Sequence, residues 1–246
     1  MKRIQRTTYW EVLKYCFLWL FLAGNSSLVA QPTGDRTVTD VEGNVYHTVI
    51  IGRYEWMAEN LKTASYSNGT AIPNITGSIS WTGTQNGAYC WYNNDIKNAK
   101  IYGALYNWHA VNTGMLCPAG WRVPSDDEWK SLEGSVDTKY GSGDPSWNKS
   151  GGRGSNAGTR LKAREGWGPG AGGSDDYGFS ALPGGERCSN GRFFIAGRSG
   201  FWWSSSGSGD SGAWYRNMIY GMEDVFRNTH PLWMGFSVRC IKDSQL

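Results

Sequence analysis

Glycine and tryptophan together limit what this chain can fold into. The 246-residue sequence contains 34 glycines and 14 tryptophans, and 33 and 12 of these follow residue 30. Glycine permits tight turns that other residues resist, whereas each tryptophan needs a site where its large ring can pack. This combination favours a loop-rich fold with a small aromatic core and argues against a regular helical bundle.

The first 30 residues have the pattern of an export signal. A head with four basic residues precedes the apolar run "YCFLWLFLAG", and the small residue Ala30 stands before Gln31 and Pro32. This order predicts a secretory signal peptide over residues 1–30, cleaved near Ala30. A membrane anchor is the alternative, but the apolar run is well short of the ~20 residues that span a bilayer. We therefore expect residues 31–246 to form a single exported domain, secreted or at the cell surface.

Removal of the leader changes the charge of the chain. Four of the 24 basic residues and one of the 21 acidic residues lie in residues 1–30, so 20 of each remain. The remaining chain is formally neutral and offers no basic surface for a nucleic-acid backbone. We therefore expect no DNA or RNA partner.

Four cysteines follow the leader, at positions 90, 117, 188 and 240. An even number in an exported chain predicts two disulfides, and four cysteines allow three pairings. Because none of the four belongs to a Cys-x-x-Cys pair, neither a zinc site nor a redox dithiol is expected.

Two local patterns predict elements in the first half. Apolar and polar residues alternate on both sides of Glu42–Asn44, which predicts a hairpin followed by inward-facing Trp56 and Leu61. In "CPAGWRVPSDDEWKSL", Ser125 and Glu128 have the spacing of a capping box, which predicts a helix that starts at Ser125. Asp126 and Asp127 would then lie at the positive end of the helix dipole.

Weaker signals fill the rest of the chain. The polar, glycine-rich residues 67–87 predict a loop, and "AYCWYNND" predicts a short strand. Residues 101–111 have helical spacing and predict a helix of about three turns. After Tyr140 the sequence predicts a surface loop and then a short amphipathic segment, "TRLKAREGW". From Tyr177 onward it predicts antiparallel strands. Strands, two helices, then strands with long glycine-rich loops indicate an α+β fold.

The stretch between Ala213 and Cys240 is unusual. It opens and closes like a strand, but residues 219–234 follow neither strand alternation nor helical spacing. We interpret this segment as large side chains displayed in or between strands, of the kind found at interface centres. A satellite hydrophobic cluster under a long loop is the alternative. The predicted binding residues are Phe194, Ile195, Ile219, Met222, Glu223, Phe226, His230, Leu232, Trp233 and Met234.

Five ordered motifs carry a family resemblance over about residues 38–243: "YGALYNWHAV", "CPAGWRVPSDDEWKSL", "GFSALPGG", "GFWWSSS" and "GFSVRC". They resemble the Fibrobacter succinogenes major paralogous domain. More distantly, Arg122–Pro124, Glu128–Trp129 and Gly235–Arg239 resemble motifs of formylglycine-generating enzymes. Both resemblances imply a C-type-lectin-like fold. By analogy with that fold, whose last strand is stapled to the helical segment, we expect a Cys117–Cys240 disulfide, which leaves Cys90–Cys188.

The resemblance to enzymes does not extend to their reactive residues. Sulfatase-activating enzymes of this fold use cysteines near the C-terminal strands, and none lies between Ala213 and Arg239. Related iron oxygenases use clustered histidines, whereas His47, His109 and His230 are scattered. His109 is expected to pack on a helix and His230 to face solvent or a contact surface. An enzyme of the formylglycine-generating type is therefore the least favoured function.

Other catalytic and metal sites find little support. Asp126 and Asp127 have a helix-capping role, and Asp175 and Asp176 lie in a glycine loop that favours a turn role. The serines at 204–206 have no histidine or acidic partner at a recognisable spacing. The sequence lacks the proline-containing loop that holds a sugar-binding calcium ion in lectins, and "YNND" matches the strand motif of those lectins only weakly. The sequence leaves open a structural calcium ion and indicates no other cofactor.

The closing segment also resembles the variable regions of proteins diversified by retroelements, which use this fold. In "RNMIYGMEDVFRNTHPLWMGFSVRC", Asn217 and Asn228 stand beside unrelated residues of every size. These patterns predict an exported, non-catalytic domain that displays a surface for a protein or carbohydrate ligand at the cell surface. The alternative is a carbohydrate-associated surface protein that binds polysaccharide through exposed Trp and Tyr.

Overall fold

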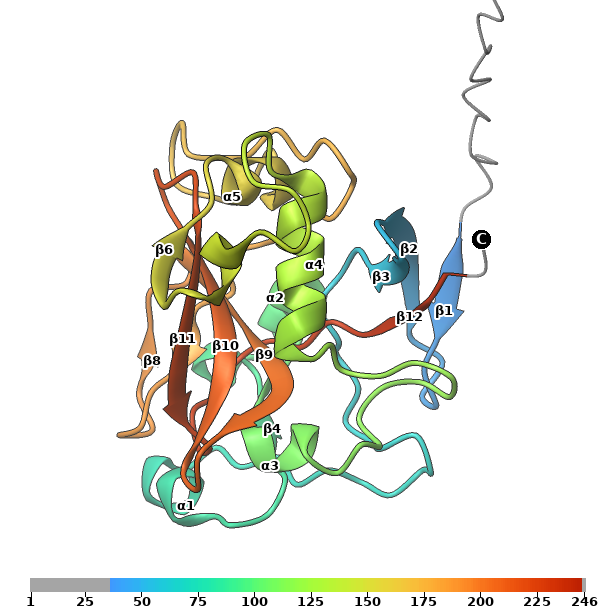
Figure 1. The fold of residues 1–246 in the computed structure, drawn as a ribbon. Coiled ribbons are helices and arrows are strands. Elements are labelled where there is room, and N and C mark those ends of the chain that lie inside the picture. The colour runs from blue at the N-terminus through green and yellow to red at the C-terminus, as the bar shows by residue number, and fades with distance from the viewer. Residues whose placement is uncertain (1–35, 245–246) are drawn as a thin grey trace, which may run out of the picture. The chain divides into compact units, whose positions relative to one another are not determined.

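Two four-stranded antiparallel sheets form the framework of residues 36–244, the part of the chain that this computed structural model describes (Figure 1). The predicted signal peptide lies outside these residues. The first sheet has the order β1 (Thr37–Thr39), β2 (Val45–Ile51), β3 (Tyr54–Met57), β12 (Ile241–Asp243). The second has the order β6 (Gly151–Arg153), β11 (Val225–Pro231), β10 (Gly212–Ile219), β9 (Ser199–Ser208). Two ribbons, β4 (Tyr89–Cys90) with β5 (Leu105–Tyr106) and β7 (Glu186–Arg187) with β8 (Phe193–Phe194), complete the strands.

The predicted hairpin is confirmed as β1–β2, with Thr39 paired to Val45. Asp40 holds its turn because one carboxylate oxygen accepts the backbone N–H groups of Glu42 and Asn44, and the other accepts the Tyr46 hydroxyl at 2.7 Å. Trp56, which the sequence places facing inward, is fully buried.

The predicted helix is confirmed as α4 (Asp126–Val136), which has a complete capping box. The Ser125 hydroxyl accepts the N–H of Glu128 at 3.3 Å, and the Glu128 carboxylate accepts the N–H of Ser125 at 2.7 Å. Trp129 and Leu132 lie buried on one face of the helix. That face packs against one side of the second sheet (Figure 1).

The three-turn helix predicted over residues 101–111 is wrong. The chain instead forms α2 (Ala99–Tyr102), then β5, then α3 (Trp108–Val111). Gly103, at a φ of 72°, ends α2, and its backbone packs so closely on Leu61 that a Cβ atom there would lie 2.7 Å from the Leu61 carbonyl oxygen. The Ala104 N–H then donates to that carbonyl at 2.9 Å, so a distant segment redirects the chain.

The structure contains two further short helices where the sequence predicts none, and helices alternate with strands along the chain in this α+β fold. The predicted loop 67–87 contains α1 (Ser78–Gly83), and the amphipathic piece near residue 160 forms α5 (Ala157–Leu161). The described residues therefore hold five α-helices rather than two. None of the helices in residues 36–244 is long and apolar enough to span a bilayer.

The strands predicted after Tyr177 form only in part. Residues 200–206 and 213–219 lie in β9 and β10 as expected, whereas residues 177–185 make isolated bridges only. The closing segment is also held by single bridges, from Phe236 to Tyr106, from Gly235 to Arg187 and from Ser237 to Trp202. This segment therefore ties β5, β7 and β9 together through the middle of the protein.

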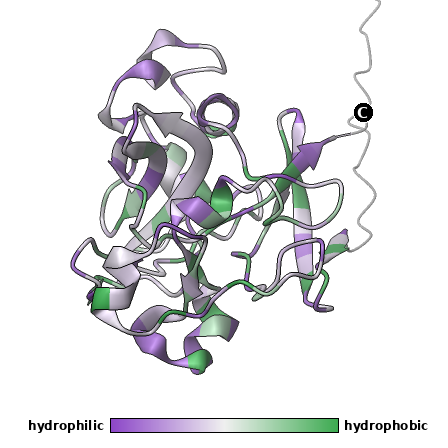
Figure 2. Ribbon diagram, turned by 90° about the horizontal axis from the view of Figure 1, so that it is seen from below, coloured by the Kyte–Doolittle hydropathy of each residue, from purple (hydrophilic) through white to green (hydrophobic). Residues whose placement is uncertain are grey.

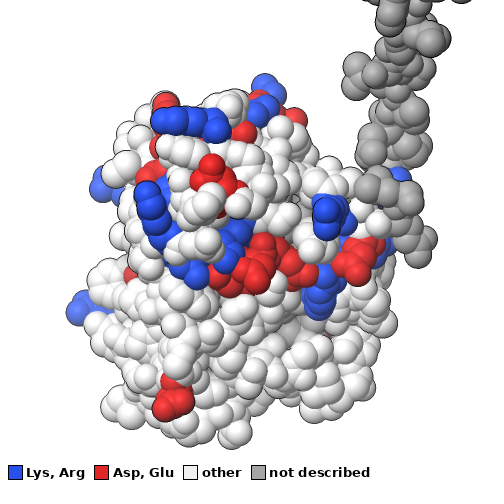
Figure 3. Space-filling model, viewed as in Figure 1, with Lys and Arg blue, Asp and Glu red and all other residues white. Residues whose placement is uncertain are grey.

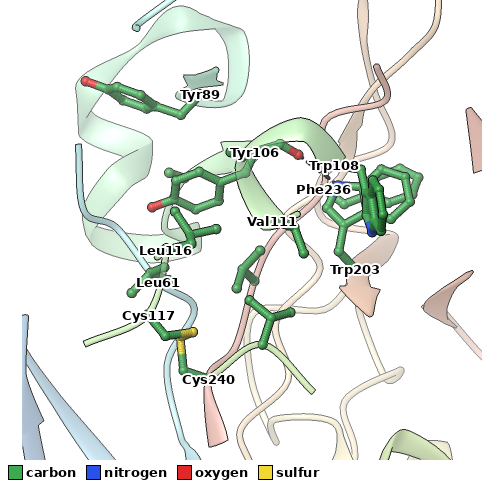
Figure 4. Close-up of a cluster of buried hydrophobic side chains, with 14 of the residues drawn as sticks. Leu61, Tyr89, Tyr106, Trp108, Val111, Leu116, Cys117, Trp203, Phe236 and Cys240 are labelled. Carbon is green, nitrogen blue, oxygen red and sulfur yellow. Dashed lines mark hydrogen bonds between the residues drawn. A yellow bond between two sulfur atoms is a disulfide. The ribbon is translucent and has the colours of Figure 1, made fainter. Parts of the chain in front are cut away.

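The Cys117–Cys240 disulfide expected from the resemblance is confirmed. It lies beside the aromatic core formed around Tyr106, Trp203 and Phe236 (Figure 4). It encloses a long part of the chain, since the two cysteines are 123 positions apart.

The second expected pair, Cys90–Cys188, is wrong, because both thiols are free in the structure. Cys90 is buried in a small cluster with Trp81 and Leu105, and its thiol faces Arg187. Because neighbouring residues of an extended chain point to opposite sides, Cys188 points away from Cys90. It packs instead against the larger aromatic core.

Candidate ligand-binding surface

Strand β11 occupies the middle of residues 219–234, the segment that lacks a recognisable pattern in the sequence. The sequence places the large side chains of this segment in or between strands, and residues 225–231 indeed form a strand, which pairs with β10 on one side and with β6 on the other. Val225 and Arg227 point toward α4, where Arg227 donates to both carboxylate oxygens of Asp126 at 2.7 and 2.8 Å. A buried arginine at an inward position hides the alternation that would have revealed the strand.

The opposite side of β11 carries Phe226, Asn228 and His230, all partly exposed, and we call this row the β11 face. Alternation along a strand requires these three side chains to share one side of the sheet. Asn228 lies opposite Tyr215 of β10, and Phe226 lies opposite Asn217. The row therefore runs along β11 on the side of the sheet that faces away from α4.

An aromatic layer supports the β11 face. The His230 ring centre lies 5.1 Å from that of Tyr215 and 5.9 Å from that of Phe236, which is fully buried. The rings of Tyr215 and Phe236 are 5.0 Å apart. Burial lowers the pKa of His230 from its usual value, so this imidazole is neutral at pH 7. The face thus consists of uncharged side chains on a rigid floor.

The β7–β8 ribbon adds an acid and a thiol near this floor. Burial raises the pKa of Glu186, and one of its oxygens, Oε2, is buried without a hydrogen-bond partner among the described residues. The other oxygen accepts the Cys188 thiol at 3.2 Å. Burial, together with the hydrogen bond and charge of Glu186, raises the pKa of Cys188 to about 12. Since the thiolate is the reactive form, this cysteine is held unreactive.

Tyr215 connects the ribbon to the β11 face. Burial raises its pKa, a hydrogen bond with Asn228 opposes that rise, and the charge of Glu186 adds to it. Sequence reasoning did not include Glu186, Cys188, Tyr215 and Asn228 among the binding residues. They come from two distant segments, and a pattern along one segment does not reveal which side chains of another lie beside it.

Nine of the ten predicted binding residues occupy three places on the surface. Phe226 and His230 belong to the β11 face, and Leu232 and Trp233 follow its end, partly exposed. A second group lies at the opposite end of the strand, in and beside the β10–β11 turn: half-buried Ile219 with exposed Met222 and Glu223. The third group, Phe194 and Ile195, is exposed at the end of β8 and in the next turn. Seven residues at about 3.3 Å each place the two ends of β11 roughly 20 Å apart.

Met234 needs a correction. Only 2 % of it is exposed, and it packs in the aromatic core with Phe236 and Trp203. The reason is the chain reversal after β11, where the Met234 N–H donates to the Pro231 carbonyl and the next residue pairs with Arg187. Its side chain is therefore part of the floor and not of the surface.

The carboxylates weighed as catalytic pairs are engaged in structural contacts. Asp126 accepts from Arg216 and Arg227, while Asp176 accepts from Arg160 at 2.6 Å. Asp175 holds its own turn by accepting the N–H and hydroxyl of Ser180. No group of three or more His, Cys, Asp or Glu side chains suited to a metal ion occurs within residues 36–244.

The fold and the surface define an α+β domain with one sheet face covered by a helix and the other supporting a row of uncharged side chains. The sequence model of the Fibrobacter succinogenes major domain matches residues 49–242, and the chain belongs to this family. Neither a search of curated proteins nor a search of solved structures found a match.

Proposed function

We propose that this chain is an exported, non-catalytic binding domain of C-type-lectin-like fold, and that the β11 face is the centre of its ligand-binding surface. The observation that carries the proposal is the contrast between the two sides of β11. The inward residues Val225 and Arg227 are buried and fixed by core packing and ion pairs, whereas the outward row is partly exposed and uncharged. Export, to the medium or the cell surface, is supported by the predicted leader and by the disulfide, since disulfides persist in oxidising compartments.

A non-catalytic role is supported by the chemistry beside the β11 face. Cys188 is the available nucleophile, and its raised pKa keeps it as a thiol. The nearby imidazole of His230 packs at a tilt against the ring of Tyr215, which belongs to the aromatic floor. This arrangement suits contact with a ligand better than proton or acyl transfer.

We further propose that the outward row is diversified, as in retroelement target proteins. Support comes from the different surroundings of the two candidate asparagines. Asn217 is only 6 % exposed, and its amide donates to the Gly200 carbonyl at 3.0 Å, so replacing it would damage the sheet. Asn228 is partly exposed, although its amide oxygen accepts the Gly151 N–H at 3.1 Å. Diversification should therefore reach Phe226, Asn228 and His230 and spare Asn217.

Substitutions along β11 test whether the strand is a rigid support for exchangeable side chains. Phe226→Ala and Asn228→Ala should each cost about 1–2 kcal/mol or less, as at partly exposed positions. Val225→Ala and Arg227→Ala should each cost about 2–4 kcal/mol, because they open the core or strip Asp126 of one partner. The free energy of unfolding in urea measures all four. Equal losses for inward and outward positions would contradict the proposal.

The genome around the coding sequence tests diversification directly. We expect a near-identical copy of the region encoding residues 216–240 and a reverse-transcriptase gene close by. In the template copy, differences should fall on codons of the outward row. If neither element is present, the diversification proposal fails, while the binding proposal stands on the β11 substitutions.

A further inference from the structure

Within residues 36–244, four stretches of at least about ten residues stand out as the longest without Lys, Arg, Asp or Glu. They cover residues 63–94, 101–121, 199–209 and 228–238. Charged residues make up 18 % of the chain, so a stretch of 32 residues such as 63–94 would carry about six at that frequency (0.18 × 32). The charges are therefore distributed very unevenly along the sequence.

The four stretches meet in the folded protein. The indole N–H of Trp81 donates to the Trp233 carbonyl at 2.7 Å, and the backbone N–H of Trp108 donates to the Leu232 carbonyl at 2.8 Å. The Trp108 indole N–H donates to the Ser204 carbonyl at 2.9 Å. All four stretches are thus joined through α1, α3, the middle of β9 and the residues that follow β11.

This junction forms one end of the described part of the molecule, and we call it the uncharged end. Helices α1 and α3 lie there in Figure 1, and the lower half of the surface in Figure 3 is almost free of charged side chains. Two charges mark its borders: Asp210 in the β9–β10 turn and Arg192, next to Gly191, whose backbone contacts Ser78. Charged residues crowd instead around α4.

The uncharged end is polar rather than apolar. Hydroxyl and amide side chains make up most of its exposed residues, among them Asn74, Thr76, Ser80, Gln85, Asn86 and Thr113. The large apolar side chains exposed on the same stretches are Ile79, Ile101 and Met115. Figure 2 looks onto this end and shows hydrophobic residues as short stretches separated by hydrophilic and intermediate ones.

We propose that the uncharged end binds a neutral polysaccharide. Hydroxyl and amide groups both donate and accept hydrogen bonds, which matches a ligand made of uncharged hydroxyls. Anionic glycans, nucleic acids and acidic peptides need cationic partners that this surface lacks. Protein interfaces have apolar cores with aromatic anchors, and this end has few exposed apolar residues. The partly exposed indole of Trp233 adds a flat surface for a sugar ring at the border with the β11 face.

This inference deepens the proposed function, because it names the ligand class of a binding domain and extends the surface beyond β11. Affinity electrophoresis of the exported chain in native gels tests it, with hydroxyethylcellulose, galactomannan and xylan as neutral probes and polygalacturonate as the anionic one. We expect retardation in at least one neutral gel, unchanged by 0.5 M NaCl, and none in polygalacturonate.

Near-isosteric substitutions locate the site. Gln85→Glu combined with Asn86→Asp keeps the shape of the surface but removes two amide donors and adds charge, and should weaken retardation about tenfold. Asn148→Asp makes the same chemical change beside α4, where its oxygen still accepts from Lys130, and should leave retardation unchanged. Trp233→Ala should also weaken it.

The outcomes separate this inference from the proposed function. Retardation lost with Phe226→Ala but kept with Gln85→Glu/Asn86→Asp would overturn the inference and support binding at the β11 face alone. No retardation in any neutral gel, or retardation in polygalacturonate that salt abolishes, would overturn the inference and leave the β11 stability test intact. An equal effect of Asn148→Asp would overturn it as well.

Discussion

Replacing Glu133 by glutamine should destabilise this protein by about 3–5 kcal/mol. Glu133 is fully buried on α4, and its two carboxylate oxygens accept from Arg153 and Arg216, which are themselves buried. The change keeps the volume of the side chain but leaves Arg153 without its counter-charge and Arg216 with Asp126 alone. Burial lowers the pKa of Arg153 to about 10, even though the charge of Glu133 opposes that shift. Keeping the Arg153 guanidinium charged in its buried position therefore already costs free energy in the folded protein.

The matched control is an ion pair of the same type on the surface. Arg122 donates to Asp243 at 2.9 Å, and the Asp243 side chain is 81 % exposed. Asp243→Asn should change stability by less than about 1 kcal/mol, because solvent screens an exposed pair. Both changes are measured as the free energy of unfolding in urea at pH 7. A loss at Glu133 no larger than that at Asp243 would show that the buried network does not hold α4 to the sheet.

That network also explains why part of the fold could be predicted from sequence and part could not. The helix at Ser125 was predictable, because Ser125 and Glu128 complete each other's hydrogen bonds within one turn. Strand β11 was not, because Arg227 occupies an inward position and its partner Asp126 is 101 residues away. The residue pattern of one segment does not reveal a partner in a distant segment. An arginine that is buried against such a partner is therefore predicted to lie on the surface.

The candidate site was predictable to a similar extent. Large apolar and aromatic residues after position 213 drew attention to this segment, and Phe226 and His230 of the predicted set lie on the β11 face. Met234 failed because its burial is decided by a chain reversal and a bridge from Gly235 to Arg187. Glu186 and Cys188 were missed because a separate ribbon brings them to the floor of the site.

The prediction of the cysteine pairs from sequence was limited in the same way. Spacing left three pairings open, and the resemblance to a known fold selected Cys117–Cys240. The remaining pair did not form, because Arg187 fills the space beside the Cys90 thiol and the neighbouring Cys188 points elsewhere. Elimination assumes that every cysteine is paired, whereas packing decides which sulfur atoms can meet.

Loss of the Cys117–Cys240 disulfide should destabilise the protein by about 5 kcal/mol. The bridge closes a loop with a sequence separation of 123, and the chain-entropy estimate for a loop of this length is roughly 4–5 kcal/mol at 25 °C. Both cysteines are buried, so reductant acts mainly on the unfolded chain. The expected result is a large fall in the urea midpoint when the equilibrium is measured with a strong reductant instead of without one.

Two double variants test whether this bridge accounts for the fall. Cys117→Ala/Cys240→Ala should unfold at the low midpoint whether or not reductant is present. Cys90→Ala/Cys188→Ala should keep the full response to reductant, because its bridge is intact and the thiols it removes are unpaired in the structure. If this second variant loses the response instead, the stabilising disulfide involves Cys90 or Cys188, and the arrangement around Arg187 would have to differ from the one described.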